Sequence, residues 1–412
     1  MAFHLSTEQT ATFDRILADA VESTGALFFG VTTAEKAIYM RAEGKKLVDD
    51  PSSDPIDEDT LFWLCSQTKM ITTIAALQLI DQGKIALDTP VETVLPELAN
   101  PVVVTSHDEA GHPVTTVPAK EKIRFGQLLN HTSGLDYMVD GTTPASGMPI
   151  AYSHSYKDQD VSAFFRIIKG SLPGVPLRFE PGSGYAYGFS TDCAGFIVER
   201  LSGKTLEQYF QDHIFAPLGI TSASFYLTPS LKDRLLPLSY RNKTGIIERW
   251  KRPPVIDRNP SHVRVHIGGA NLYASQKDYL TLLRHLLQIK ANCATHPILS
   301  RASVDSMFSP SLPPAGAAAL QVAENDPYLG LPAVGAAQFG HGLFVNMVDV
   351  PGKRRKGSGS WGGWASTSFF VDPTTGVAAV FGMQLVPTGD ETHMRLFDVL
   401  ERGVYAGLIA KL

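Results

Sequence analysis

Ser66 and Lys69 stand three residues apart at the start of a long apolar segment. Residues with this spacing on a helix lie on one face, about one turn apart, so the two side chains can meet. At a helix N-terminus, backbone N–H groups and the positive end of the helix dipole favour a developing oxyanion beside Ser66. A lysine between apolar walls and that positive end loses its proton more easily. The pair therefore predicts a nucleophilic serine with a lysine base.

The Ser-x-x-Lys spacing is common by chance. The alternative is a purely structural pair, an N-cap serine followed by a solvated lysine. The residues after Lys69 argue against it. Segment 71–80 is apolar on nearly every side and ends near Gly83, which predicts a buried helix. Burying a lysine that has no function would cost free energy of folding. We therefore favour the catalytic interpretation.

A serine and lysine pair also needs a second proton-handling group near the leaving atom. Tyr187 is the candidate, because it lies in a glycine-flanked turn that can present a side chain into a cleft. A tyrosine that only packs, with its hydroxyl bonded to backbone, is the alternative. Tyr185, two residues earlier, competes for the same role.

A second donor for the oxyanion is expected from Trp361–Gly362–Gly363–Trp364. Glycines let a strand edge approach a ligand so closely that a backbone N–H can point at it. Taken alone, the two glycines are also compatible with a simple strand kink.

The elements that must position these residues are predicted from apolar periodicity. Strands near both ends of the chain, with helices between them, predict one antiparallel sheet built from the two termini and covered by a helical insertion. Ser6 and Gln9 form the start of an amphipathic helix. The predicted strands are 26–32, 37–41, 341–348, 366–371 and 376–386, and a helix follows them at the C-terminus.

Three stretches between these elements are predicted to be irregular. Residues 101–121 form a polar surface excursion, and Ser309 to Gly340 is rich in Pro, Ala and Gly. The loop from Met138 to about Asp158 lacks periodicity and is a candidate border of a pocket.

Composition narrows the classes of function. The chain has 412 residues, 44% hydrophobic and 19% charged, as in an ordinary globular protein. A net charge of -5 gives no support for nucleic-acid or membrane binding, and no apolar run is long enough for a membrane span. Three scattered cysteines predict no disulfide framework, and the histidines show no metal-ligand spacing. Without a secretory signal, a soluble cytoplasmic protein is expected.

The motifs together resemble a known family. Ser66-x-x-Lys69, His131–Gly134, Tyr187 after Pro181–Gly182, Ala216–Gly219 and Gly268–Gly269 occur in the order and rough spacing of the serine β-lactamase/penicillin-binding-protein superfamily. The set is most similar to the class C β-lactamase-like (family VIII) esterases and covers about residues 10–410. Within it, 66–73, 128–135 and 354–358 look like the fungal lovastatin-type acyltransferases, or simvastatin synthase-like transesterases, of secondary metabolism.

This resemblance implies a fold and a chemistry. The fold is α/β (α+β) and class C β-lactamase-like, a single catalytic domain with a sheet subdomain at about 1–65 and 280–412 and a helical subdomain at about 66–279. The enzyme would be soluble and cofactor-free, with Ser66 as nucleophile, Lys69 as base and Tyr187 as proton relay. The oxyanion hole would be formed by the N–H groups of Ser66 and of Trp364 or an immediate neighbour.

Two positions depart from the β-lactamase pattern. Phe189 stands where those enzymes have the asparagine of Tyr-x-Asn, and Trp361–Gly362–Gly363 replaces their Lys-Thr-Gly. Since that lysine helps to hold a substrate carboxylate, the site should prefer less charged acyl esters or thioesters. The predicted pocket residues are Tyr137, Tyr185, Phe189, Trp361, Gly362 and Gly363.

Other residues receive structural interpretations. His131 is expected to be a turn or core histidine and Cys65 a core residue. The basic run Arg354–Lys356 is interpreted as a solvated loop, with an acidic carrier domain or its phosphopantetheine arm as the less favoured partner.

The sequence therefore predicts a serine acyltransferase or esterase that works through an acyl-Ser66 intermediate, with Lys69 neutral at working pH. The acyl group passes to water or an alcohol, and its donor is a small-molecule ester or thioester, with an acyl-carrier domain as a further possibility. A β-lactamase or DD-peptidase, and a non-catalytic binding protein of the same fold, are the alternatives.

Overall fold

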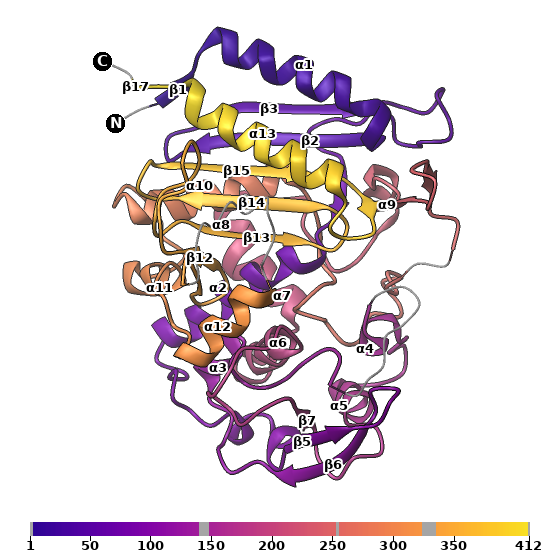
Figure 1. The fold of residues 1–412 in the computed structure, drawn as a ribbon, viewed down its shortest axis with the longest axis vertical. Coiled ribbons are helices and arrows are strands. Elements are labelled where there is room, and N and C mark those ends of the chain that lie inside the picture. The colour runs from indigo at the N-terminus through magenta and orange to yellow at the C-terminus, as the bar shows by residue number, and fades with distance from the viewer. Residues whose placement is uncertain (1–2, 140–147, 253–254, 324–334, 411–412) are drawn as a thin grey trace.

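A seven-stranded antiparallel sheet joins the two ends of the chain (Figure 1). The structure, a computed structural model, describes residues 3–139, 148–252, 255–323 and 335–410. The strands in spatial order are β11 (Ala337–Phe339), β12 (Phe344–Asn346), β13 (Gly359–Gly363), β14 (Thr367–Asp372), β15 (Val377–Gly382), β2 (Ala26–Thr33) and β3 (Ala37–Gly44). Since β15 pairs with β2, the predicted sheet built from both termini is confirmed.

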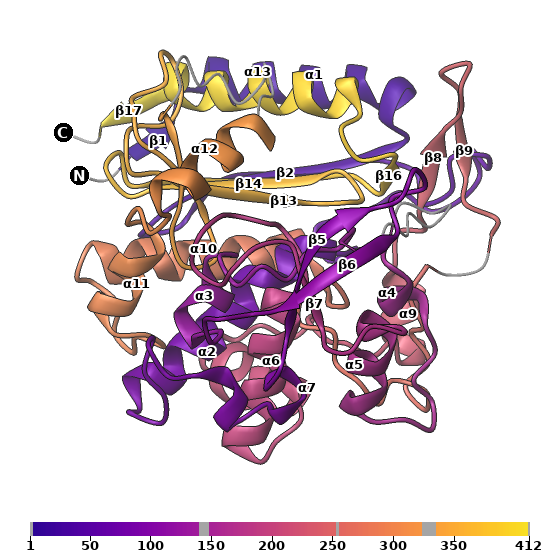
Figure 2. The same cartoon turned by 60° about the horizontal axis from the view of Figure 1, so that its bottom comes forward.

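Helices cover both faces of this sheet (Figure 2). On one face lie α1 (Thr7–Thr24) and α13 (Glu391–Gly407), and on the other lies α10 (Gln276–Lys290). Every residue of β2 is buried, as expected for a strand covered on both faces. The predicted start of α1 is confirmed, because Ser6 Oγ accepts a hydrogen bond from the Gln9 N–H at 3.0 Å.

The segment predicted as a buried helix begins with a single 3₁₀ turn, Cys65–Gln67, and continues as α2 (Thr68–Asp81). All residues of α2 from Thr68 to Leu79 are buried, so the apolar sequence reflects packing on every side. Helix α2 contacts α6 (Ser190–Ser202) at the centre of the helical part. Strand β4 (Leu61–Trp63) leads into the turn and pairs with β10 (Tyr273–Ser275).

Shorter elements complete the described chain. The helices are α3 (Phe125–Leu129), α4 (Ile150–Ser153), α5 (Val161–Lys169), α7 (Leu206–Phe210), a π-helical turn (Gln211–Phe215), α8 (Ala216–Leu218), α9 (Pro229–Arg234), α11 (Arg301–Met307) and α12 (Pro314–Ala323), with 3₁₀ turns at Val91–Thr93 and Pro96–Leu98. The small strands are β1 (Phe3–Leu5), β5 (Val102–His107), β6 (Pro113–Pro118), β7 (Pro176–Leu177), β8 (Ser239–Arg241), β9 (Ile247–Arg249), β16 (Leu385–Val386) and β17 (Leu408–Ala410).

Two stretches are more regular than expected. Residues 101–121 contain the antiparallel pair β5 and β6, whose polar composition reflects solvent exposure rather than lack of structure. Part of the stretch 309–340 forms α12 and β11, while 324–334 lies outside the described residues. The division into a sheet subdomain and a helical subdomain at the expected boundaries stays a prediction.

Candidate active site

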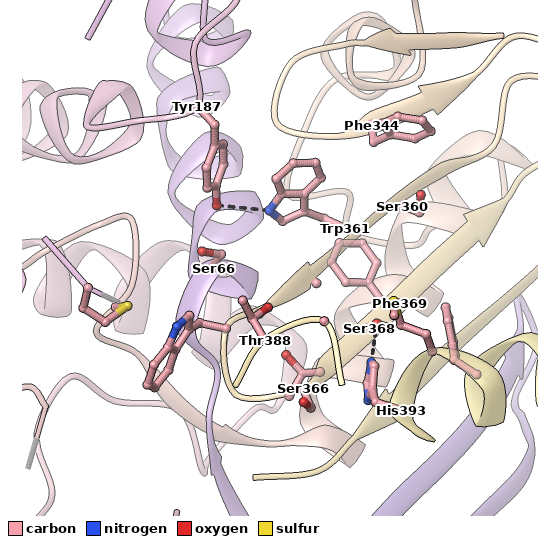
Figure 3. A pocket seen from close by; sticks show the side chains of 18 of the residues that line it. Ser66, Tyr187, Phe344, Ser360, Trp361, Ser366, Ser368, Phe369, Thr388 and His393 are labelled. Atoms are coloured by element: carbon pink, nitrogen blue, oxygen red, sulfur yellow. Dashed lines mark hydrogen bonds between the residues drawn. The ribbon is translucent and has the colours of Figure 1, made fainter. Parts of the chain in front are cut away.

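Ser66 is presented by a tight turn between β4 and α2. Cys65, immediately before it, has a φ of +49°, a left-handed conformation that is uncommon for a residue with a side chain. Cys65 itself is fully buried, as expected for a core residue, whereas Ser66 is partly exposed among buried neighbours. The turn thus directs the Ser66 hydroxyl out of the core and into a cavity (Figure 3).

Lys69 lies under this hydroxyl. Its Nζ is 3.3 Å from Ser66 Oγ and donates to the Gly269 carbonyl oxygen at 2.7 Å. The side chain is only 3% exposed and passes near two phenol rings, with Nζ 4.7 Å from the Tyr187 centroid and 5.6 Å from that of Tyr137. The predicted meeting of Ser66 and Lys69 on one helical turn is therefore present in the structure.

The charge of Lys69 is subject to opposing effects. Burial lowers the pKa of its ammonium, while charge on Tyr137, Tyr187 and Asp192 raises it, and the net direction is a raised pKa. These groups titrate together, so the expectation that Lys69 is neutral at working pH stays a prediction. The neighbours come from segments remote from α2, and the apolar helix sequence does not reveal them.

Tyr187 points into the same cavity as Ser66 (Figure 3). Its hydroxyl oxygen accepts a hydrogen bond from Trp361 Nε1 at 3.2 Å, and the two ring centroids are 5.1 Å apart. The turn that carries it needs glycine, because a Cβ at Gly188 would overlap the Leu135 carbonyl oxygen. The structure thus brings Ser66, Lys69 and Tyr187 together.

The Trp361–Trp364 stretch passes directly beside the serine turn. Gly363 is so close that a Cβ there would lie 2.5 Å from the Leu64 carbonyl oxygen. This is the close backbone approach expected of glycines on a strand edge. A Cβ at Gly363 would also lie 3.2 Å from the Cys65 Cβ. The assignment of Trp364 as the second oxyanion donor stays a prediction.

The cavity has a volume of about 440 Å³ and extends from Ser66 to helix α13. Tyr137, Trp361, Gly362 and Gly363 line it, as the sequence predicts. At its far side, Ser368 Oγ and His393 Nε2 are 2.9 Å apart (Figure 3). Burial lowers the pKa of His393 to about 4, so this histidine is uncharged at neutral pH.

Several lining residues were missed by sequence reasoning. The periodicity of the C-terminal helix identifies its apolar face but not which part of that face meets a cavity. Residues 140–147 of the loop predicted to border a pocket lie outside the described residues, although Met148 and Pro149 do line the cavity. The missed lining residues include Phe344, Thr388, His393, Met394 and Phe397.

Two predicted pocket residues do not line this cavity. Tyr185 is buried in a separate apolar cluster with Leu312 and Phe339. Phe189 packs among aromatic rings, with its centroid 4.9 Å from that of Tyr137 and 5.5 Å from that of Phe164. The turn before α6 directs Tyr187 toward Ser66 and these two neighbours into the protein. Both residues thus lie outside the lining of this cavity, and their assignment to a substrate pocket stays a prediction.

The basic run also differs from its interpretation as a solvated loop. Arg354 is 4% exposed and bonds both carboxylate oxygens of Glu401 on α13, through Nε at 2.8 Å and Nη2 at 2.6 Å. Lys353 joins the same carboxylate at 3.2 Å. Only Arg355 and Lys356 are exposed. Arg354 thus holds α13 beside the cavity and is not available to a carrier domain.

His131 lies beside the proposed catalytic residues but has a structural role. His131 is buried and packs against Tyr187, with ring centroids 4.9 Å apart. Burial and the nearby Lys69 lower its pKa to about 3, in keeping with a packing residue.

In the described part of the chain, no group of three or more His, Cys, Asp or Glu side chains could hold a metal ion. No helix there is both long and apolar enough to cross a membrane.

Comparison with known protein sequences gives the same family by two routes. The family model described as Beta-lactamase matches residues 13–401. The lovastatin esterase of Penicillium rubens is 30% identical, with 94% of this chain and 95% of the relative covered. The monacolin J acid methylbutanoyltransferase of Aspergillus terreus is also 30% identical, covering 93% and 91%.

The structural comparison agrees with the sequence comparison. Unliganded simvastatin synthase (LovD) from Aspergillus terreus superposes with a TM-score of 0.81 at 28% identity, covering 97% of this chain and 99% of that one. The predicted fold class and the predicted resemblance to lovastatin-type enzymes are therefore confirmed. A serine turn, a buried lysine and a match over nearly the whole length together show that this chain belongs to the Beta-lactamase family.

Proposed function

We propose that this protein is a serine esterase or acyltransferase that forms an acyl ester on Ser66 and passes the acyl group to water or an alcohol. The observation that carries the proposal is the 3.3 Å contact between Lys69 Nζ and Ser66 Oγ at the floor of an open cavity. Relatives named as an esterase and as an acyltransferase, both 30% identical, support the two possible acceptors.

The first half-reaction moves one proton and one acyl group. Ser66 Oγ attacks the carbonyl carbon of the ester or thioester, and its proton passes to the pair formed by Lys69 and Tyr187. In this proposal Lys69 rests as an ammonium, in keeping with its raised pKa, and the active form is the one in which this pair has lost one proton. The pair then protonates the leaving alcohol or thiol, and the acyl-serine remains.

The second half-reaction runs the same steps in reverse. Water or an alcohol gives its proton to the pair as it attacks the acyl carbon, and Ser66 recovers the proton as it leaves. The N–H groups of Ser66 and Trp364 are proposed to hold the oxyanion in both steps. The approach of Gly363 to the serine turn supports that placement.

The cavity lining favours uncharged acyl groups. Among the described residues that line it, the one lysine or arginine is Arg354, whose guanidinium is already bonded to Glu401. The uncharged His393 adds no cation at neutral pH. Lys69 lies beneath Ser66 and already donates to the Gly269 carbonyl oxygen. A substrate carboxylate would therefore lose its hydration without gaining a free positive partner. Neutral esters and thioesters of small molecules are the proposed donors.

The test is the mass of the intact protein after mixing with p-nitrophenyl butyrate, with and without an alcohol. The expected result is an increase of one butyryl group in the wild type and in Ser360→Ala, and none in Ser66→Ala. Ser360 is a suitable control because it lines the same cavity. Faster loss of the adduct with alcohol, together with a new ester, indicates an acyltransferase. An adduct that persists in Ser66→Ala, or no adduct and no turnover across a panel of esters, would refute the proposal.

A further inference from the structure

Asp192 is a buried carboxylate close to the catalytic lysine that no step of the proposed acyl transfer uses. It lies in the first turn of α6 and is 0% exposed. Its two carboxylate oxygens accept hydrogen bonds from the Gly269 N–H at 2.7 Å and from the Tyr152 hydroxyl at 2.8 Å. A buried carboxylate is retained at a cost in free energy unless another charge or a function compensates it.

Two short routes connect this carboxylate to Lys69. The backbone route runs through Gly269, whose N–H donates to Asp192 and whose carbonyl oxygen accepts from Lys69 Nζ at 2.7 Å. The side-chain route runs from Asp192 to the Tyr152 hydroxyl and then to the Tyr137 hydroxyl, 2.8 Å further on. Tyr137 in turn lies beside Lys69, whose Nζ is 5.6 Å from the centroid of the Tyr137 ring.

The close packing of this region leaves room only for glycine at position 269. A Cβ there would lie 2.5 Å from the Tyr152 hydroxyl and 2.7 Å from an Asp192 oxygen. Asp192, Tyr152 and the Gly269 carbonyl group that binds Lys69 therefore pack tightly against one another. The four segments involved are far apart in sequence, so the connection exists only in the folded protein.

We propose that Asp192 is a positioning residue that keeps Lys69 charged and so sets the pH at which Ser66 becomes nucleophilic. This inference rests on the proposed function. Asp192 does not touch the reacting atoms. It acts through Gly269, Tyr152 and Tyr137 on the proton that the Lys69–Tyr187 pair must lose.

Among the residues that the structure describes, the other groups near Lys69 do not supply a comparable charge. Burial raises the pKa values of Tyr137 and Tyr152, so both phenols stay protonated at neutral pH. His131 is uncharged, because burial and Lys69 lower its pKa to about 3. Tyr187 faces Lys69 as its proton partner in the proposed reaction.

Apart from Lys69, the described groups around Asp192 are also uncharged. Burial raises the pKa values of Tyr156 and of the Cys193 thiol, and it does the same for Cys65 beside Lys69. Burial raises the pKa of Asp192 to about 6, against opposing effects of Lys69 and Tyr152, so the carboxylate is ionised above that pH. Asp192 is thus the carboxylate that balances the Lys69 ammonium under the conditions of the reaction.

The direction in which Asp192→Asn shifts the pH profile follows from the charge of the Lys69–Tyr187 pair. The active form of the Lys69–Tyr187 pair carries one positive charge fewer than the resting form. Removing the Asp192 charge therefore favours proton loss and moves the rise of kcat/KM to lower pH, by about one unit or more for a close charge partner. A pair that binds its proton less tightly is also a weaker base, so the plateau of kcat/KM should fall.

The experiment is the pH profile of kcat/KM with p-nitrophenyl butyrate for wild type, Asp192→Asn and Glu207→Gln. Glu207 is the matched control: it is a buried carboxylate in the helical part that accepts from a hydroxyl, Ser224 at 3.0 Å, and from a backbone N–H, Phe225 at 2.8 Å. The rise of kcat/KM with pH should move to lower pH in Asp192→Asn and should stay at the wild-type pH in Glu207→Gln.

The outcomes separate this inference from the proposed function. A wild type that forms no Ser66-dependent adduct refutes both. An active wild type with an unshifted rise in Asp192→Asn, or a rise moved to higher pH, refutes only the role of Asp192. If Asp192→Asn does not fold, Tyr152→Phe serves instead. Its loss of the hydrogen bond to the carboxylate should move the rise in the same direction by less, and no movement counts against the inference.

Discussion

The indole N–H of Trp361 donates to the hydroxyl oxygen of Tyr187 at 3.2 Å, across the mouth of the serine turn (Figure 3). Trp361, which the resemblance aligns with the lysine of Lys-Thr-Gly, thus bonds to the proposed proton relay. Because a hydrogen bond stabilises negative charge on its acceptor, this contact should matter most when Tyr187 gives up its proton.

Trp361→Phe should lower kcat/KM for p-nitrophenyl butyrate by about 10-fold, the value of one hydrogen bond to a charged group. The phenyl ring keeps most of the packing against Tyr187. The double variant Trp361→Phe/Tyr187→Phe provides the control. If Trp361 acts through Tyr187, the double variant should be no slower than Tyr187→Phe alone, and additive losses would contradict that route.

Tyr187→Phe should reduce kcat/KM by at least about 100-fold, the usual contribution of a general acid–base group. Tyr185→Phe is the matched control, since Tyr185 lies two residues away but packs outside the cavity. It should leave kcat/KM within a few-fold of wild type. A silent Tyr187→Phe with an impaired Tyr185→Phe would show that the wrong tyrosine has been assigned.

Glu401→Gln should destabilise the protein by about 3 kcal/mol, because it leaves the buried Arg354 guanidinium without its bidentate partner. Urea unfolding measures the loss. Asp349→Asn, which affects the exposed pair with Arg355, should cost less than about 1 kcal/mol. Equal losses in the two variants would show that burial does not strengthen the Glu401 contact.

The Glu401 contribution should also depend on pH. Burial acts to raise the pKa of this carboxyl, but Arg354 and Lys353 outweigh burial and lower it below its ordinary value. The stabilisation is therefore present above the pKa of the unfolded chain and is lost as the pH falls through the lower folded value. The difference in stability between wild type and Glu401→Gln should shrink on strong acidification.

Asp192→Asn should show the opposite pH dependence of stability. Burial raises the pKa of Asp192 from 3.8 to about 6, so its favourable contribution is present below pH 4 and is lost as the pH rises through 6. Above that range, the native protein carries a cost of about 3 kcal/mol. The Tm of the variant relative to wild type should therefore rise between pH 4 and pH 7, and a constant difference would contradict the raised pKa.

The sequence by itself determined the local features of this protein. Ser66 and Lys69 meet because helical geometry places residues three apart on one face, whatever the rest of the fold does. The strands at the two ends, the N-cap at Ser6 and the buried α2 follow from apolar periodicity and local hydrogen bonding. Glycines 362 and 363 likewise marked a strand edge that approaches another backbone.

Only the tertiary structure decided which remote groups surround those local features. The charge of Lys69 depends on neighbours such as Asp192, which no spacing rule connects to α2. Arg354 looks like a solvated residue in sequence and is buried because Glu401 arrives from α13. Electrostatic interactions act through space, and periodicity reports only neighbours along the chain. The pairing of Ser66 with Lys69 was therefore readable from the sequence, while the groups around Lys69 and the cavity beside Ser66 required the fold.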